Sequence, residues 1–248
     1  MHGGGSSPKP LVKPRVQGWG QVQAWVRTSY LWQKLLRLRD WFDLYIDDHG
    51  FLRFGWHNQH EFVAGAWRSN QPTPKRVARL ARMGVATIIN LRGKRDHGSW
   101  RLEKEACETY GVEMIDFTIS SRAVPNYETI RAADALFAQA RHPILFHCKS
   151  GADRAGVMAA LYLLLHAGSD IDTAAKQLSL RYLHLKHSRT GLLDAFLDAY
   201  RPYARRGVSF RDWAEKHLDP DAITYHFRSQ RWGNRWGNFL VDTILRRE

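Results

Sequence analysis

Hydrophobic positions along the chain form two alternating patterns. Short continuous apolar runs at 85–91, 112–119 and 143–146 are typical of strands buried on both faces of a parallel sheet. Around them, apolar residues recur every three or four positions, which predicts helices over 74–83, 99–110, 127–140, 156–166, 170–180 and 190–200. Two shorter strands are predicted at 51–56 and 61–67. This order indicates an α/β fold with a central, mostly parallel sheet flanked by helices and right-handed crossovers.

The segment from His147 to Gly156 joins the strand at 143–146 to a long apolar helix. Its sequence is His-Cys-Lys-Ser-Gly-Ala-Asp-Arg-Ala-Gly, so Cys148 ends a strand and Arg154 begins a helix. Backbone N–H groups of such a turn, the positive end of the helix and a planar guanidinium together suit a dianionic phosphate. The same field favours the nucleophilic thiolate of Cys148. A lone cysteine is otherwise a small buried hydrophobe, but the strand, glycines and helix around it favour a functional role.

This Cys-x5-Arg pattern, with a His before it and a Gly after it, resembles the phosphate loop of cysteine-dependent protein tyrosine and dual-specificity phosphatases. The resemblance implies that Cys148 attacks phosphorus, that Arg154 clamps the phosphate and that His147 orders the loop. It implies no cofactor and no metal ion. The implied phosphate-binding set is Lys149, Ser150, Gly151, Ala152, Asp153 and Arg154.

A second stretch carries the same resemblance. Residues 67–72 (Trp-Arg-Ser-Asn-Gln-Pro), a helix and residues 89–92 (Ile-Asn-Leu-Arg) are similar to the front half of the compact, bacterial-type dual-specificity phosphatases. The resemblance therefore covers about residues 61–200 and implies their fold.

The general acid is less clearly marked. In this family it is usually an aspartate on a loop between a strand and a helix, but the corresponding loop here, 120–126, contains no carboxylate. Asp116 lies at a similar distance from the cysteine, inside the predicted strand. Asp153 is similar to a residue of the myotubularin-type and Sac-type phosphoinositide phosphatases that has been considered for proton transfer. Both stay candidates, with Asp153 preferred, and either could instead be structural, Asp153 as a helix cap.

Two further loop positions bear on turnover and substrate. Ala155 stands where many relatives have Ser or Thr, whose hydroxyl stabilises the departing thiolate, so turnover is expected to be slow unless Ser150 substitutes. Lys149 adds positive charge inside the loop, which suits substrates with several phosphates or a neighbouring acidic group. The alternative for Lys149 is a solvated, outward-pointing side chain.

Charge and cysteine content indicate which partners the protein binds and in which compartment it works. The 248 residues carry a formal net charge of +13, with a pI near 10.0, which predicts attraction to anionic partners. The two cysteines, Cys107 and Cys148, provide no disulfide framework and predict a reducing, cytoplasmic setting. No signal-peptide pattern occurs, and no apolar run approaches the ~18 residues of a spanning helix. We therefore expect a cytoplasmic protein, with peripheral attachment to the inner face of a membrane as an option.

Composition divides the chain into four predicted parts. Residues 1–20 form a flexible basic arm, 21–46 a basic, aromatic, amphipathic helix, 47–203 the phosphatase domain, and 204–248 a basic extension rich in Trp and Arg. The helix at 21–46 suits an anionic membrane surface, although packing of its tryptophans on the catalytic domain is favoured. The extension repeats Arg-Trp-Gly-Asn at 231–238, and it suits lipid headgroups or nucleic acid, or packing against the first helix.

The remaining basic, histidine-containing segment does not indicate a metal site. The run 181–189 contains His184 and His187, but no further ligand completes a metal set, so a solvated or phosphate-attracting loop is expected. No recognised nucleic-acid-binding fold is present, and we expect no nucleic-acid partner. The sequence thus predicts a phosphatase of the dual-specificity type, acting on phosphotyrosine proteins or on lipid-linked or inositol phosphates. The alternative is a catalytically weak phosphate-binding module at an anionic membrane surface.

Overall fold

The computed structural model describes residues 19–48, 51 and 55–232. The chain divides into two units, 1–39 and 40–248. Helix α1 (Trp19–Phe42) supplies the described part of the first unit. Residues 1–18 of the predicted arm and most of the repeat at 231–238 lie outside the described residues, whereas Trp19 and Gly20 already belong to α1.

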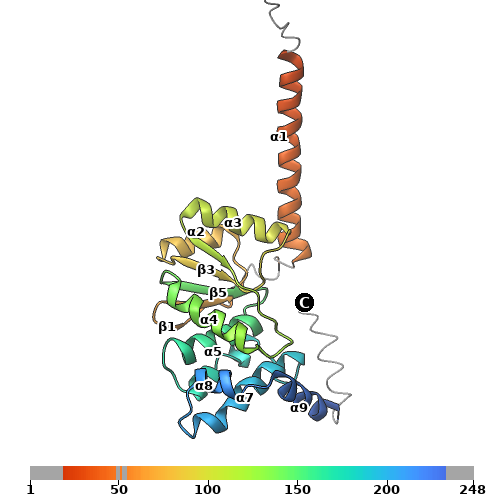
Figure 1. Ribbon diagram of the computed structural model, residues 1–248. Helices are drawn as coiled ribbons and strands as arrows, with labels where there is room; N and C mark the ends of the chain where they lie inside the picture. Colours follow the sequence, from red (N-terminus) through yellow and green to blue (C-terminus); the bar gives the residue numbers. More distant parts are fainter. Residues whose placement is uncertain (1–18, 49–50, 52–54, 233–248) are drawn as a thin grey trace, which may run out of the picture. The chain divides into compact units, whose positions relative to one another are not determined.

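The second unit is built on a five-stranded sheet with the order β1-β2-β5-β3-β4 (Figure 1). Its strands are β1 (His60–Val63), β2 (Ala66–Asn70), β3 (Thr87–Asn90), β4 (Glu113–Asp116) and β5 (Ile144–Cys148). Strand β1 runs antiparallel to β2, whereas β2, β5, β3 and β4 are parallel to their neighbours. The predicted mostly parallel sheet is confirmed, and β5, which ends in Cys148, is its central strand.

Three predicted elements differ from the structure. The strand predicted at 61–67 is wrong, because Gly65, with φ of +74°, turns the chain and makes β1 and β2 a hairpin. In the strand predicted at 51–56, the described residues Phe51, Gly55 and Trp56 belong to no strand. The strand predicted at 112–119 stops at Asp116, since β4 is an edge strand that pairs along only the four residues of β3. The periodicity of the sequence does not show where a strand stops pairing with its neighbour.

The helix predicted at 170–180 is also shorter than expected. The structure has α6 (Ile171–Ala175) and then, after a break, the 3-10 turn η3 (Leu180–Tyr182). Asp170 caps α6, since its side chain accepts a hydrogen bond from the Thr173 amide at 2.8 Å.

Helices cover both faces of the sheet (Figure 1). Helices α2 (Pro74–Arg82) and α3 (Gly98–Tyr110) pack on one face, where they bury Ile88 and Leu145. Helices α4 (Tyr127–Gln139) and α5 (Asp153–Leu165) pack on the other, where they bury Ile89 and Phe146. Neighbouring residues of one strand thus point into opposite cores, which explains the continuous apolar runs.

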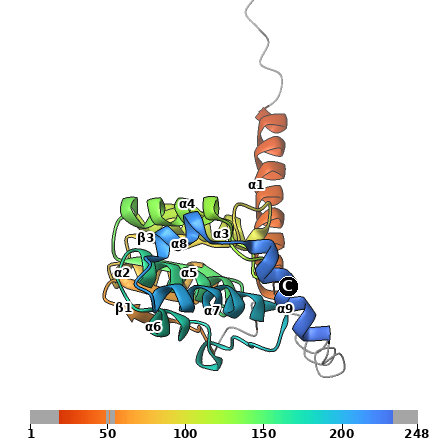
Figure 2. The same cartoon turned by 60° about the horizontal axis from the view of Figure 1, so that its bottom comes forward.

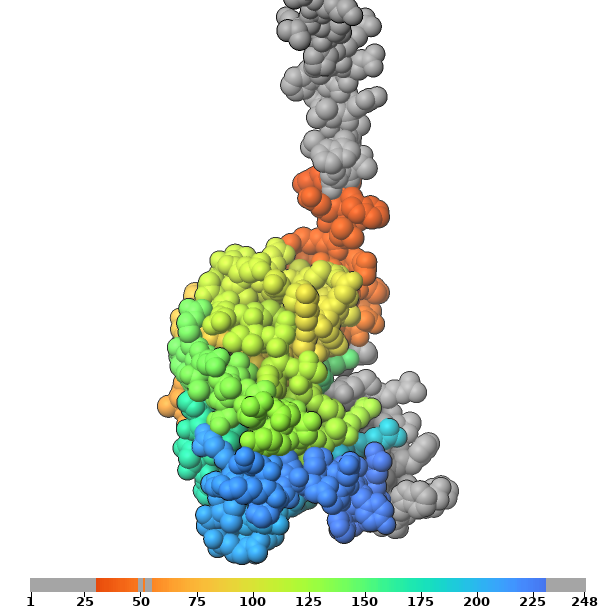
Figure 3. All heavy atoms as spheres, viewed as in Figure 1, coloured from red at the N-terminus to blue at the C-terminus, as the bar shows by residue number. Residues whose placement is uncertain are grey.

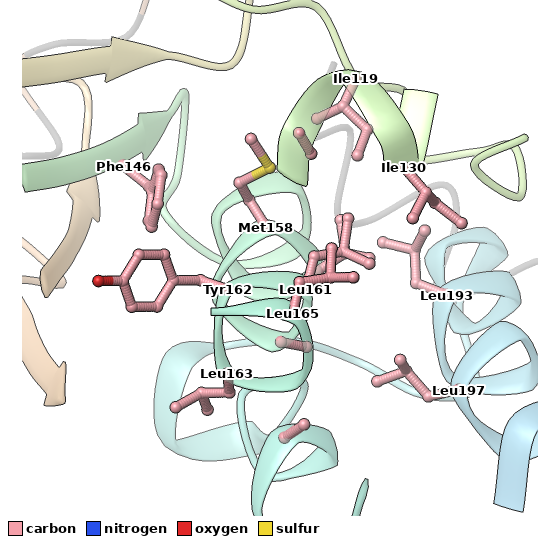
Figure 4. Packing of buried hydrophobic residues seen from close by; sticks show 14 of the residues in the cluster. Ile119, Ile130, Phe146, Met158, Leu161, Tyr162, Leu163, Leu165, Leu193 and Leu197 are labelled. Carbon is pink, nitrogen blue, oxygen red and sulfur yellow. The ribbon is translucent and has the colours of Figure 1, made fainter. Parts of the chain in front are cut away.

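Helix α5 is almost entirely buried and occupies the centre of the larger core (Figure 4). Phe146 and Tyr162 lie on its sheet side, and Leu193 and Leu197 of α7 (Leu192–Ala204) lie on the opposite side. Each such side chain contributes about 1.5–3 kcal/mol when fully buried. This packing fixes the helix whose first turn carries Asp153 and Arg154.

The core continues past residue 203. Helix α8 (Phe210–Lys216) buries Phe210 and Trp213 against α7, and α9 (Pro220–Trp232) packs along α7 as well (Figure 2). Arg211 of α8 also pairs with Asp134 of α4 at 2.7 Å, and these elements form one continuous surface (Figure 3). The first tryptophan of the C-terminal region is therefore a core residue of the second unit.

Candidate active site

The turn between β5 and α5 curls around the sulfur of Cys148. The amide of Gly151 donates a hydrogen bond to Sγ of Cys148 at 3.2 Å. Gly151 has φ of +76°, and a Cβ there would lie 2.7 Å from the backbone N of Asn70. Only glycine therefore fits this position, because a side chain would push the loop away from the end of β2. The amides of this turn and the start of α5 create an anion-binding concavity next to the thiol.

A buried arginine on β2 binds the backbone carbonyls of the phosphate loop. Arg68 of β2 has no exposed surface, and its Nη2 donates to the carbonyl oxygens of Gly151 and Ala152, both at 2.8 Å. Its Nη1 donates to the carbonyl of Gln177 at 2.6 Å, and its guanidinium lies 4.0 Å from the centre of the Tyr182 ring. Burial lowers the pKa of Arg68 to about 10, so it stays charged at neutral pH. These bonds turn the loop carbonyls inward to the protein and leave the amides for a ligand.

His147 and its partners support the loop from the α3 side. Its Nε2 lies 2.7 Å from Oε1 of Glu103, and both side chains are fully buried. Oε2 of Glu103 accepts a hydrogen bond from Gln71 at 2.5 Å, and the amide of Gln71 donates to the carbonyl of Lys149 at 3.4 Å. Gln71 therefore links Glu103 to the loop, and His147 lies next to Glu103. The loop-ordering role of His147 stays a prediction.

Asp153 points to a buried histidine. Its Oδ1 lies 2.7 Å from Nδ1 of His184, whose Nε2 lies 2.6 Å from Oδ2 of Asp194 in α7. Burial alone would lower the pKa of His184, but the hydrogen bonds to Asp153 and Asp194 outweigh it and raise the pKa to about 9. At neutral pH, His184 therefore carries a proton between two carboxylates. We name Asp153, His184 and Asp194 the histidine clamp.

Asp116 lies farther from the loop. It pairs with Asn90 of β3, and Asn90 pairs with His147 of β5, so two interstrand steps of about 4.8 Å each separate Asp116 from β5. Its carboxylate accepts hydrogen bonds from Nδ2 of Asn90 at 2.7 Å and Nε1 of Trp100 at 3.0 Å. The structure thus brings Asp153, and not Asp116, into the loop.

The two cysteines occupy different environments. Cys107 is buried in α3, and burial, together with the nearby charges of Glu103 and Glu108, raises the pKa of its thiol. Cys148 is also shielded from solvent, but it faces the Gly151 amide and the first turn of α5. Arg154, the second residue of that helix, is partly exposed. Cys148, unlike Cys107, thus faces an amide of the phosphate loop.

A third group of charges lies beside the loop. Asp48, which is 4% exposed, binds Arg92 through both oxygens at 2.5 and 2.6 Å. Its Oδ1 is also 3.8 Å from Nζ of Lys149 and 3.9 Å from Nη2 of Arg95. We name Asp48, Arg92, Arg95 and Lys149 the Asp48 cluster.

The segment before Asp48 is docked on α3. Leu44, in the π-helical turn η1 (Asp43–Asp47), is fully buried, and Asp43 accepts a hydrogen bond from the Gly98 amide at 3.0 Å. A Cβ on Gly98 would lie 2.4 Å from Cα of Asp40, so this contact also requires glycine. The docking brings Asp48 to the phosphate loop.

Several of these residues escaped the sequence interpretation. The sequence places Arg68 and Gln71 in a motif without a role, and it assigns Asp48, Glu103, His184 and Asp194 no position at the loop. Glu103 carries the clearest sequence signal, because it lies three residues before Ala106 and next to Leu102, on the inward-facing side of the predicted helix. Within the described residues, no group of three or more His, Cys, Asp or Glu side chains could hold a metal ion. No helix in the described part of the chain has the length and apolarity to cross a membrane.

A cysteine at the end of the central strand, a loop with inward amides and an arginine in the first helical turn define the class of cysteine-dependent phosphatases. Comparison with known families agrees: residues 54–192 match the model described as "DSP-PTPase phosphatase fused to NAD+ Kinase". The chain belongs to this family of dual-specificity-type phosphatase domains.

Individual proteins resemble parts of the chain. The chain is 28% identical over 122 residues to the dual specificity protein phosphatase TpbA of Pseudomonas aeruginosa, covering 49% of this chain and 53% of TpbA. It thus spans about half the length of the curated relatives it matches. A crystal structure of P. aeruginosa TpbA matches with a TM-score of 0.47 and 22% identity, covering 68% of this chain and 90% of that one. The structure of PTPMT1 matches with a TM-score of 0.42 and 19% identity, covering 60% and 99%.

Proposed function

We propose that the protein hydrolyses phosphate monoesters through a cysteinyl-phosphate intermediate on Cys148. The observation that carries this proposal is the loop itself, whose carbonyls are bound by Arg68 while the Gly151 amide faces the sulfur. Its amides and Arg154 are suited to bind the three non-bridging oxygens of a phosphate above the thiolate. We further propose that Lys149, Ser150, Gly151, Ala152, Asp153 and Arg154 form the phosphate-binding set and that His147 orders it.

The proposed reaction has two steps. First, the Cys148 thiolate forms an S–P bond as the P–O bond to the leaving group breaks, and the leaving oxygen takes a proton from a general acid. Then water forms a P–O bond as the S–P bond breaks, inorganic phosphate departs, and the water proton returns to the residue that acted as acid. The Gly151 amide, 3.2 Å from the sulfur, stabilises the thiolate in both steps. It thereby supplies a donor that the fully buried Ala155 lacks.

We propose Asp153 as the general acid, through its link to His184. A carboxylate bonded to a protonated histidine has a proton close by, whereas Asp116 accepts bonds from Asn90 and Trp100. With an alkyl phosphate, a poor leaving group, Asp153→Asn should lower kcat about 10²–10⁴-fold. With an acidic aryl phosphate, whose leaving group needs no proton, the loss should be small.

The test compares kcat for an alkyl and an aryl phosphate in wild type, Asp153→Asn and the matched variant Asp116→Asn. Equal losses on both substrates in Asp153→Asn would show that the residue is structural. A loss confined to the alkyl phosphate in Asp116→Asn would assign the acid to Asp116 instead.

The substrates that we propose are phosphotyrosine proteins or lipid-linked or inositol phosphates. A variant of P. aeruginosa TpbA forms a crystalline complex with pTyr, which supports phosphotyrosine proteins as candidates. The charge of +13 and Lys149 support lipid-linked or inositol phosphates. Phosphate release is measured with a phosphotyrosine peptide, inositol phosphates and phospholipid vesicles. The substrate with the highest kcat/KM identifies the substrate class. Binding of these ligands without Cys148-dependent release would favour the catalytically weak phosphate-binding module.

We also propose an anionic membrane surface as a partner, through α1. Leu31, Trp32, Leu35 and Leu38 are 57–65% exposed, and Lys34, Arg37 and Arg39 interleave with them. Apolar side chains next to cations suit the headgroup region of an anionic bilayer. Such attachment would place the enzyme at the cytoplasmic face of a membrane.

Replacing Trp32 and Leu35 with alanine should weaken binding to anionic phospholipid vesicles at least about tenfold, because both lose apolar area that enters the bilayer. Co-sedimentation measures the effect. Leu180→Ala, at an equally exposed leucine of η3, is the matched control and should bind as wild type does. Unchanged binding of the double variant would exclude α1 as the attachment site.

A further inference from the structure

Positive charge accumulates on one side of the phosphate loop. Arg92 and Arg95, which follow β3, and Lys149 of the loop all lie within 4 Å of the Asp48 carboxylate. Burial and the like charge of Arg92 lower the pKa of Arg95; Asp48 opposes this, and Arg154 adds to the lowering. Asp48 thus faces several cations that are crowded against one another.

Exposure shows which of these groups an anion could reach. The side chains of Lys149 and Arg95 are 25% and 38% exposed, whereas Asp48 and Arg92 are only 4% exposed. Nε of Arg92 is buried and has no hydrogen-bond partner among the described residues. The cluster is therefore open on the Lys149 and Arg95 side and keeps an unused donor on Arg92.

Asp47 is the other acid at this edge. Its carboxylate is 67% exposed and lies 2.9 Å from Nε2 of His97. The hydrogen bond to His97 lowers the pKa of Asp47, and Lys149 contributes in the same direction. Two carboxylates, Asp47 and Asp48, thus lie beside Arg92, Arg95 and Lys149, and the charge of Arg154 acts on Arg95 as well.

Asp48 is poorly suited to be the general acid. Its two oxygens bind the two terminal nitrogens of Arg92, and such a bidentate pair stabilises the ionised carboxylate. A general acid must carry a proton or receive one as the leaving group departs. His184 can pass its proton to Asp153, whereas the Arg92 guanidinium releases none near neutral pH, so Asp48 lacks a proton source. The carboxylate instead occupies the position that an anion would take against these cations.

We propose that the Asp48 cluster is a second anion subsite, which binds a phosphate adjacent to the one held by the Cys148 loop. Arg95 and Lys149 contact the second phosphate, and Arg92 stays paired with Asp48 behind them. The preferred substrates then carry two neighbouring phosphates, free or in a lipid headgroup. This inference rests on the proposed function and extends it to a substrate class.

Binding is measured by calorimetry in a Cys148→Ser background, so that turnover plays no part. An inositol bisphosphate with adjacent phosphates should bind about tenfold more tightly than an inositol monophosphate, because the second phosphate gains charge-assisted bonds. Adding Arg95→Gln should remove most of this gain. Arg141→Gln removes the same charge, but Arg141 pairs with Glu113 at the start of β4, the end of the parallel strands away from the phosphate loop. This control variant should retain the tighter binding of the bisphosphate.

Asp48→Asn should act in the opposite direction and tighten bisphosphate binding, since the resident carboxylate no longer competes. A melting curve of each variant checks that it is folded. The same bisphosphate headgroup in vesicles, compared with the soluble form, separates a lipid from a free inositol phosphate.

Equal affinity for mono- and bisphosphate, or no effect of Arg95→Gln in a folded protein, would overturn the subsite. Failure of the wild type to release phosphate from any substrate would instead overturn the proposed function, because the binding comparison does not depend on turnover.

Discussion

Cys148→Ser is expected to lower phosphate release at least about 10⁴-fold, because a serine hydroxyl stays protonated at neutral pH and cannot replace the thiolate as nucleophile. The measurement is steady-state release of inorganic phosphate from an aryl phosphate. Ligand binding should persist, since the Arg68 bonds to Gly151 and Ala152, which hold the loop in place, do not involve the sulfur.

The chain provides its own control for this substitution. Cys107 lies in the α2–α3 core, and burial keeps it in the thiol form. Cys107→Ala should therefore leave kcat near the wild-type value while lowering stability by the loss of buried contacts. Phosphate release that survives in Cys148→Ser, or disappears in a folded Cys107→Ala, would contradict the assignment of the nucleophile.

The histidine clamp is expected to make folding stability depend strongly on pH. His184 binds its proton more tightly in the folded protein, with a pKa of about 9 against an ordinary 6.5. The contribution of this proton binding to the free energy of unfolding is therefore fully present below about pH 6.5 and is lost as pH rises through about 9. The shift corresponds to about 3 kcal/mol of unfolding free energy. Loss of the clamp also releases Asp153, so activity should fall over the same range.

Asp194→Asn isolates this effect, because it removes one carboxylate from His184 without touching the phosphate loop. Urea unfolding at pH 6 and pH 9.5 should show a smaller difference in free energy for Asp194→Asn than for wild type. Asp198→Asn is the matched control, since Asp198 lies on the same helix but pairs with Lys186 and Arg201 near the surface. Equal pH dependence in wild type and Asp194→Asn would mean that the clamp does not stabilise the fold.

The phosphate loop could be read from the sequence because it is local. Strand β5, the turn and α5 are consecutive, and their apolar runs and glycines predict the geometry directly. Helices α3 and α4 begin and end within one residue of their expected limits, since their apolar spacing is regular and Asn126 caps α4. The β1–β2 hairpin was missed because the apolar run continues across Gly65, and the turn depends on one positive φ.

The partners of the loop could not be predicted in the same way. Arg68 reaches Gly151 over 83 positions, and Arg92 reaches Asp48 over 44. Nothing in the spacing of polar residues encodes such pairs, because they arise only when β2 and β5 become neighbours and the segment before Asp48 docks on α3. Likewise, His184 was recognised as polar, but its burial between Asp153 and Asp194 depends on the packing of α7.

Trapping the covalent intermediate tests the central claim most directly. Enzyme mixed with an acidic aryl phosphate is quenched in acid within milliseconds, and the peptide that contains Cys148 is analysed by mass spectrometry. We expect a phosphoryl group on Cys148 that forms and decays at rates consistent with turnover, and none on Cys107. Turnover without any phosphoryl group on Cys148 would contradict the account.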